Sequence, residues 1–203
     1  MDKSHDLYTK SSCFWSPGVR SPFEIPEVIS AFIKDKTVID LGHGAGDLSV
    51  GFSAYAKKVN GVEFTNKREN LNKNVGLIEN LSLYRENYWN AIKDKKDFVI
   101  GDVYYVWGYS GCPFPARDGD YLKNLFNLAA HIKKCLPQNG LSDDRIIFTY
   151  AKISDASKFP FDIKIPFLAS EKPVEKLRRS KAWEDLCVVG LRFHNTFLEK
   201  MIL

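Results

Sequence analysis

A glycine-rich stretch at residues 38–47, Val-Ile-Asp-Leu-Gly-His-Gly-Ala-Gly-Asp, constrains the fold more than any other part of the chain. Apolar, β-prone residues lead into three alternating glycines, and the segment from Leu48 to Ala56 carries enough apolar residues to seat a helix on a sheet. The pattern predicts a strand, a glycine turn and a helix. Because glycines let a ligand approach the backbone and a helix begins with free N–H groups, we expect this turn to bind a nucleoside cofactor.

The composition predicts one compact domain. The chain has 203 residues, of which 44% are hydrophobic and 13% aromatic, which suits a sizeable core and excludes a solvated tail. The net charge of +4 and the pI of about 8.7 permit an acidic partner. They fall short of the pI above about 9 that is typical of a dedicated nucleic-acid module.

The cysteines and the apolar runs indicate the compartment. The four cysteines are far apart and form no Cys-x-x-Cys pair: Cys13, Cys112, Cys135 and Cys187. We therefore expect reduced thiols, no metal site and a cytoplasmic location. No apolar run approaches the ~20 residues of a membrane span, and the polar N-terminus lacks a signal-peptide core, so no membrane partner is expected.

The elements around the glycine turn are readable from their periodicity. We predict helices at Pro26–Lys34 and Asp47–Lys57, with strands at Thr37–Leu41 and Val59–Glu63. The second strand ends in the acidic Glu63. A carboxylate at that position faces the same crevice as the glycine turn and can accept hydrogen bonds from both hydroxyls of a ribose.

The middle of the chain is less regular. Apolar residues recur at helical spacing from Leu71 to Lys93, which predicts two helices broken near Gly76 or Ser82 and leaves no third strand. Asp97–Val103 reads as a strong strand that runs into Tyr104–Trp107. After this strand we predict a loop at Gly108–Asp118 and a helix that begins at Asp118 or Asp120 and stops at Pro137 and Gly140. The remaining predictions are strands at Arg145–Tyr150 and Phe161–Ile165, a basic helix at Val174–Trp183 and strands within Leu186–Phe197.

Strands that alternate with helices predict an α/β fold with a doubly wound, mostly parallel sheet, helices on both faces and an incomplete third-strand region. We predict a single domain over residues 1–203. Residues 1–36 form an N-terminal cap or substrate segment, 37–150 the cofactor-binding core, and 151–203 the C-terminal strands and loops.

The glycine turn belongs to a set of motifs that resembles the class I S-adenosylmethionine (SAM)-dependent methyltransferases. Asp40–Gly46 matches their acidic residue followed by an apolar residue and Gly-x-Gly-x-Gly, and Glu63 matches their acidic residue at the end of the second strand. Leu136–Gly140 matches their Leu-x-Pro-x-Gly before the fifth strand. The resemblance covers roughly Val38 to Tyr150.

The resemblance implies SAM as the cofactor and S-adenosylhomocysteine (SAH) as its product. The glycine turn would approach the methionine part and the ribose, Glu63 would take the ribose hydroxyls, and Phe64 would lie near the adenine. Residues around Asp102 would border the transferable methyl group. The cofactor-binding residues expected on this basis are Asp40, Gly42, His43, Gly44, Gly46, Glu63, Phe64, Asp102 and Val103.

Two departures from the family bear on the cofactor and the acceptor. Without a third strand, the usual acidic contact to the adenine amino group is lost. Asp102 could supply it if Phe98–Ile100 were the third strand, but the helix, the Pro-Gly stop and the strand that follow in order favour the fourth. Asp102-Val103-Tyr104-Tyr105 is not the Asn/Asp-Pro-Pro-aromatic motif of amino-group methylation on adenine, cytosine or glutamine, which disfavours those acceptors. Asp102 is the candidate for acceptor positioning or proton removal. Tyr104 and Tyr105 are candidates for an aromatic pocket wall, and plain strand packing is their alternative.

The function predicted from these residues is SAM-dependent methyl transfer to an unidentified acceptor, with a small molecule or a protein side chain favoured over nucleic acid. One alternative is a binding or regulatory protein that keeps the fold without turnover. A second is an NAD-dependent oxidoreductase, which is disfavoured because Asp47 stands where the third glycine of Gly-x-Gly-x-x-Gly should fall. The sequence carries no signal for the oligomeric state.

Overall fold

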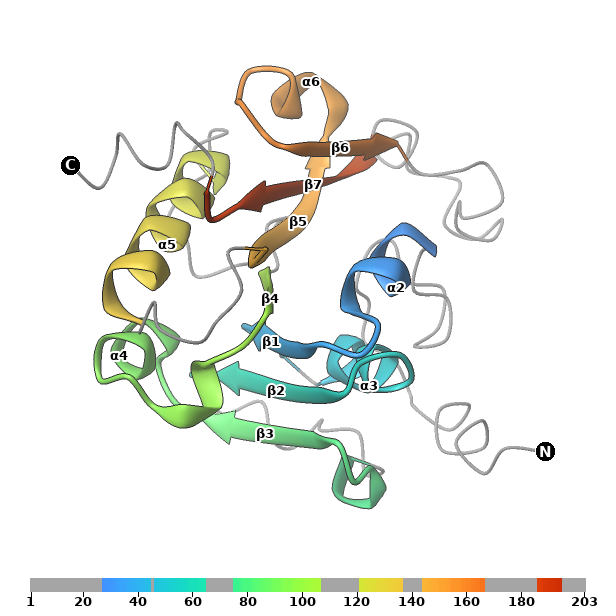
Figure 1. Cartoon of the computed structure of the whole chain (residues 1–203), viewed down its shortest axis with the longest axis vertical. Helices are drawn as coiled ribbons and strands as arrows, with labels where there is room; N and C mark the ends of the chain where they lie inside the picture. The colour runs from blue at the N-terminus through green and yellow to red at the C-terminus, as the bar shows by residue number, and fades with distance from the viewer. Residues whose placement is uncertain are drawn as a thin grey trace.

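The computed structural model of the chain describes residues 27–44, 46–64, 75–106, 121–136, 144–166 and 186–194. These residues form a seven-stranded sheet with the strand order β3-β2-β1-β4-β5-β7-β6 (Figure 1). Strands β1 to β5 run parallel to one another, and β7 runs antiparallel to both of its neighbours, β5 and β6. The prediction of a mostly parallel α/β sheet is confirmed.

The elements follow one another in the order expected of alternating strands and helices. Their bounds are α2 Glu27–Ile33, β1 Thr37–Leu41, α3 Asp47–Ser53, β2 Lys58–Glu63, η2 Val75–Leu77, β3 Leu81–Arg85, α4 Tyr88–Lys93, η3 Asp97–Val99, β4 Val103–Val106, α5 Tyr121–Cys135, β5 Ile146–Lys152, α6 Ile153–Ala156, β6 Ile163–Pro166 and β7 Leu186–Arg192.

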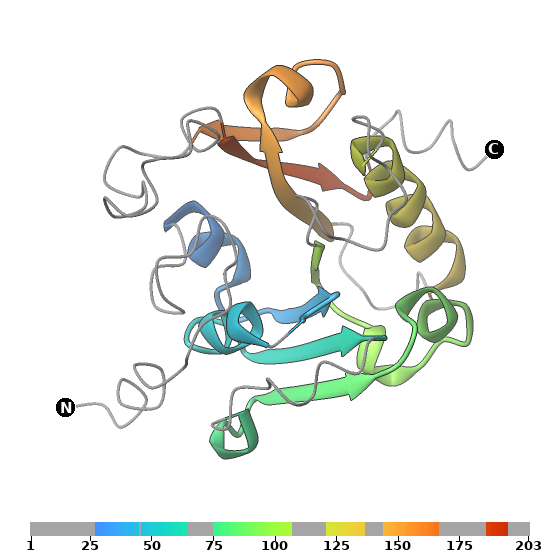
Figure 2. The same cartoon turned by 180° about the vertical axis from the view of Figure 1, so that it is seen from behind.

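The sheet is buried on both faces, and each face has its own core. Helices α2 and α3 lie on one side of the sheet and α4 and α5 on the other, in both views (Figures 1 and 2). Successive strand residues point to opposite faces, so Val38 packs with the α2–α3 core while Ile39 packs with the α4–α5 core. Because both faces are covered, the central strands are almost continuously apolar.

The prediction that the third strand is missing is wrong. Leu81–Arg85 forms β3, which pairs in parallel with β2, with Val59 opposite Leu81 and Glu63 opposite Arg85. Its apolar residues fit both the period of a helix and the period of a strand. Pairing with β2 is what makes the segment a strand. The following helix, α4, begins only after Asn87, whose side-chain oxygen accepts a hydrogen bond from the Trp89 N–H at 2.9 Å.

The predicted strand at Asp97–Val103 is displaced along the chain. Asp97–Val99 is a 3₁₀ turn, and β4 begins only at Val103. The Phe98 ring stacks on Tyr84 of β3 with centroids 4.1 Å apart, and the Phe98 carbonyl accepts a hydrogen bond from the Asn60 side chain at 2.9 Å. The segment before β4 therefore packs against β2 and β3 before the chain joins the sheet as β4. Gly101 lies at this junction, and a larger residue would not fit there because its Cβ would lie 2.6 Å from the side chain of Ile39.

The other predicted elements agree with the structure except at their ends. The helix expected at Asp47–Lys57 ends at Ser53, and the strands expected near residues 161–165 and 186–197 are β6 and β7. The proposed N-terminal cap up to residue 26, the loop at 108–118, the basic helix at 174–183 and most of the Leu136–Gly140 stop lie outside the described residues. Among the helices that the structure describes, none is both long and apolar enough to cross a membrane.

Candidate functional site

The glycine turn connects the carboxyl end of β1 to α3 and holds its glycines in a conformation that favours them. Gly42, Gly44 and Gly46 have φ angles of 86°, 57° and 85°. The Gly42 N–H donates to the Val62 carbonyl at 2.8 Å, which ties the turn to the end of β2. A Cβ added at Gly42 or Gly44 would meet no atom of the described residues within 4 Å, so no described side chain covers the backbone of the turn there.

Glu63 meets this turn directly. It is the last residue of β2, and its Oε2 accepts a hydrogen bond from the Gly44 N–H at 3.1 Å. The structure therefore brings together the turn and the strand-end carboxylate that the sequence places far apart. Phe64 follows Glu63 and is 66% exposed, so its ring is free to contact a ligand at this edge.

Asp40 is a buried carboxyl group one strand position before the turn. Its side chain is 1% exposed and its Oδ2 accepts a hydrogen bond from the Ser49 hydroxyl at 2.5 Å. Its Oδ1 has no hydrogen-bond partner among the described residues. Burial raises the pKa of Asp40 to about 7; the Ser49 hydroxyl lowers this pKa, and the nearby Glu63 raises it. An orphan buried acceptor of this kind suits a donor or cation brought by a ligand.

His43 lies inside the turn, between Gly42 and Gly44. Burial lowers the pKa of His43, against the opposing effect of Glu63, and its Nδ1 has no partner among the residues described. The ring packs over Gly61 of β2, where an added Cβ would lie 3.0 Å from His43 Cδ2. Gly61 is a site residue that the sequence analysis missed. The signal was a glycine inside a strand, which often marks a close approach.

Glu86 is a second missed residue. It follows β3 directly, and its N–H donates to the Glu63 carbonyl at 3.1 Å, which places it beside Glu63 at the carboxyl edge of the sheet. With the third strand present, an acidic residue stands where the resemblance expects the contact to the adenine amino group. The signal would have been the alternating Leu81–Tyr84 segment ahead of a Glu-Asn pair.

Asp102 and Val103 are not part of this site. Val103 pairs with Val38 near the start of β1, and Asp102 Oδ2 accepts a hydrogen bond from the Thr37 N–H at 2.8 Å. The start of a parallel strand lies at the opposite edge of the sheet from its carboxyl end. The predicted contacts of Asp102 and Val103 with the cofactor are therefore wrong, and so is the predicted catalytic role of Asp102. The cause is the later start of β4.

Tyr104 and Tyr105 are core residues on opposite faces of β4, and both are 0% exposed. The Tyr104 hydroxyl donates to the Val99 carbonyl at 3.1 Å, and burial raises the pKa of Tyr104 to about 12. Tyr105 packs edge-to-face against Phe52 with ring centroids 5.3 Å apart. The prediction that these tyrosines wall an acceptor pocket is wrong, because neither ring reaches the surface. Strand packing, the alternative, accounts for both.

The site residues that remain at the carboxyl edge come from three strands and the turn. They are Asp40, Gly42, His43, Gly44, Gly46, Gly61, Glu63, Phe64 and Glu86. The described side chains contain no group of three His, Cys, Asp or Glu residues arranged to hold a metal ion.

Comparisons with known proteins rest on structure alone. Neither a protein-family model nor a curated protein matches the sequence. Among solved structures, a protein from Streptococcus mutans assigned as a SAM-dependent methyltransferase matches with a TM-score of 0.54 and 15% identity, over 81% of this chain and 46% of that one. Another methyltransferase structure, complexed with SAH, gives 0.54 and 14%, over 85% and 47%. The chain thus spans about half the length of these first matches.

A third match covers both chains almost completely. Precorrin-6y C5,15-methyltransferase from Geobacter metallireducens has a TM-score of 0.50 and 11% identity, over 94% of this chain and 97% of that one. Together with the strand order and the glycine turn, these matches define the fold. The chain has the Rossmann-like fold of class I SAM-dependent methyltransferases.

Proposed function

We propose that this protein is a SAM-dependent methyltransferase. The observation that carries the proposal is the hydrogen bond from the Gly44 N–H to the Glu63 carboxylate at 3.1 Å, which joins the glycine turn to an acidic strand end. This contact lies beside the point where the strand order reverses, because β2 and β3 extend the sheet on one side of β1 and β4 and β5 on the other. Open α/β sheets bind their ligands at that point.

The residues at the carboxyl edge fit SAM. Glu63 has further lone pairs beyond the one that meets Gly44, so it can accept from ribose hydroxyls. The exposed Phe64 and the adjacent Glu86 would meet the adenine ring and its amino group. The orphan oxygen of Asp40 suits a cation such as the ammonium group of the methionine part.

Bound SAM would supply an activated methyl group on a sulfonium ion. The protein's contribution is to hold the cofactor at a fixed position, align the acceptor with the S–CH₃ bond and exclude water. The open backbone at Gly42 and Gly44 allows the close approach that this alignment needs. We favour a small molecule or a protein side chain as the acceptor, because no long basic stripe runs through the sequence.

A transfer assay with methyl-labelled SAM tests this proposal. The full chain is incubated with pools of small molecules, proteins and RNA, and the label is followed into each pool. We expect transfer to a small molecule or a protein, and its loss in a Glu63→Ala variant that lacks the ribose contact. SAH binding without transfer to any pool would instead support a SAM-binding regulatory protein. Transfer to RNA alone would overturn the favoured acceptor class but keep the reaction.

A further inference from the structure

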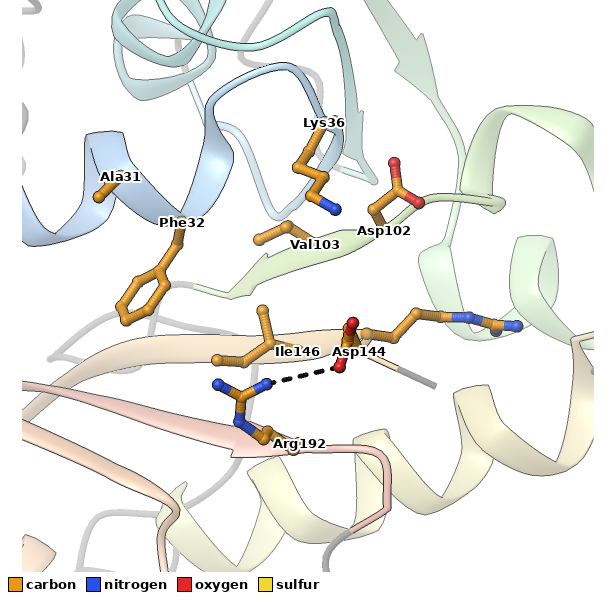
Figure 3. A pocket seen from close by; sticks show the side chains of 9 residues that line it. Ala31, Phe32, Lys36, Asp102, Val103, Asp144, Ile146 and Arg192 are labelled. Atoms are coloured by element: carbon orange, nitrogen blue, oxygen red, sulfur yellow. Dashed lines mark ion pairs between the residues drawn. The ribbon is translucent and has the colours of Figure 1, made fainter. Parts of the chain in front are cut away.

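A cavity of about 270 Å³ lies at the amino edge of the sheet, and Figure 3 shows side chains that line it. The glycine turn follows the carboxyl end of β1, at the opposite edge. It is bounded by α2, by the turn before β1, by the starts of β4 and β5, and by the end of the antiparallel β7. Strand β1 has five residues with a rise of about 3.3 Å each, so the cavity and the glycine turn are separated by about 13 Å of strand. The cavity is therefore separate from the proposed cofactor site.

One wall of the cavity is apolar and anchored in the core. Val103 and Ile146 are 2% and 5% exposed and belong to the core beneath α2 and α3. Phe32 of α2 faces them across the cavity, and its side chain is partly exposed. Val103 and Ile146 therefore expose only a small apolar area at the floor of the cavity, which packing holds in place, and Phe32 exposes more.

The two carboxylates at the cavity, Asp102 and Asp144, differ in how firmly they are held. Asp102 accepts the Thr37 N–H at 2.8 Å, which uses one of its oxygens to fix the start of β1. Asp144 Oδ1 lies 3.9 Å from Arg192 Nη1, and 74% of the Asp144 side chain is exposed. That separation exceeds the about 2.7–2.9 Å of a charge-assisted hydrogen bond, so the pair holds Arg192 only loosely.

Two cations face the cavity from opposite sides. Lys36 reaches in from the turn before β1, and Arg192 from the end of β7 (Figure 3). Within the described residues Lys36 has no ion-pair partner, and its side chain is exposed. Arg145 also borders the cavity, but it is only 4% exposed and interacts with the Tyr104 hydroxyl. The lining thus carries three cations, Lys36, Arg145 and Arg192, against two carboxylates, Asp102 and Asp144, which leaves a formal charge of +1 (3 − 2). Lys36 and Arg192 are the two of these cations that are not buried.

We propose that this cavity binds a small organic anion, with a carboxylate or phosphate group held between Lys36 and Arg192. The guanidinium fork and the ammonium group are the side chains best suited to such oxygens. The apolar body of the ligand packs against Phe32, Val103 and Ile146. A volume of about 270 Å³ lies just below the usual range of ligand pockets, which begins near about 300 Å³, so the ligand is small.

Calorimetric titration of the full chain with phenyl phosphate and with phenylacetate, at constant ionic strength, tests this site. We expect saturable binding of at least one probe. Lys36→Gln and Arg192→Gln should each weaken it by at least about tenfold, because each removes one charge-assisted contact. Lys158→Gln is the matched control, since Lys158 is an exposed lysine on the turn after α6 that pairs with Asp155 outside the cavity. Thermal melts establish that the variants fold.

The outcomes separate the ligand sources. Binding of phenyl phosphate alone identifies a phosphate ligand, and binding of phenylacetate alone identifies a carboxylate; either result supports the site. Failure of both probes to saturate, or an equal loss in the Lys158→Gln variant, overturns it. Affinity for SAH, measured on the same variants, should stay unchanged, and a parallel loss would contradict a separate site.

Discussion

At the scale of single residues, Asp40 is the group in the candidate site whose burial costs the folded state the most free energy. A carboxyl group that is 1% exposed, with one oxygen bonded to Ser49 and the other without a partner among the described residues, destabilises the fold when it ionises. An apolar residue in this strand would avoid that cost. The residue type is therefore better explained by a ligand than by packing.

Asp40→Asn should change how stability depends on pH. The pKa of Asp40 rises from 3.8 to about 7 on folding, so between these values the folded state holds a proton that the unfolded state has released. The free energy of unfolding of the wild type, relative to the variant, should fall by about 2–3 kcal/mol from about pH 5 to about pH 8. Urea unfolding at both pH values measures the difference. A difference that does not vary with pH would contradict the raised pKa.

Gly44→Ala should weaken cofactor binding far more than it weakens the fold. The φ of 57° costs an alanine about 1 kcal/mol, and the added methyl group projects into the open space in front of the turn. A clash of about 1–3 kcal/mol with a bound ligand would lower the affinity for SAH by about tenfold or more. Calorimetry and thermal melts measure the two effects.

Gly76→Ala is the matched control for this prediction. Gly76 is exposed and lies outside the turn, and a Cβ added there would also meet no atom within 4 Å in the part of the chain that the structure describes. Its substitution should leave the affinity for SAH unchanged. Equal affinities for the Gly44 and Gly76 variants would place the ligand away from the turn.

At the scale of elements, the strands that sit next to strong local signals were predictable. β1 lies immediately before the glycines and matches its predicted bounds, and β2 differs by one residue. β3 was not predictable in the same way, because it is an edge strand whose residues also fit a helix until β2 pairs with it. The start of β4 depends on Phe98 packing across the sheet, a contact with no local signal.

A double-mutant cycle at Tyr84 and Phe98 tests this arrangement of β3 and η3. Their rings are stacked 4.1 Å apart with an interplanar angle of 10°. Alanine at each position, singly and together, should reveal a coupling free energy of about 0.5–1.5 kcal/mol in urea unfolding. Additive effects would show that the 3₁₀ turn does not pack on β3 as described.

At the scale of the whole molecule, the parallel topology places the polar and charged residues of the two sites at opposite edges of one sheet. Residues that follow a strand, such as Glu63 and Glu86, gather at the carboxyl edge with the glycine turn. Residues that precede a strand, such as Lys36, Asp102 and Asp144, gather at the amino edge.

This division explains which part of the site was predictable. The sequence locates a residue relative to its own strand, so the turn and Glu63 could be assigned. The predicted strand began too early in the chain. Asp102 was therefore assigned to the carboxyl edge although it lies at the amino edge, and Tyr104 and Tyr105 were assigned to a pocket although they lie in the sheet interior. The site therefore depends on strand ends, which periodicity locates least well.

Calorimetric titration of the full chain with SAH and, separately, with NAD tests the central claim most directly. The site described here predicts that SAH binds with one-to-one stoichiometry and that NAD does not bind. It also predicts that Glu63→Ala, which removes the carboxylate that meets the Gly44 N–H, weakens SAH binding by at least about tenfold while the variant stays folded. Binding of NAD without SAH, or an unchanged affinity of the Glu63 variant for SAH, would contradict it.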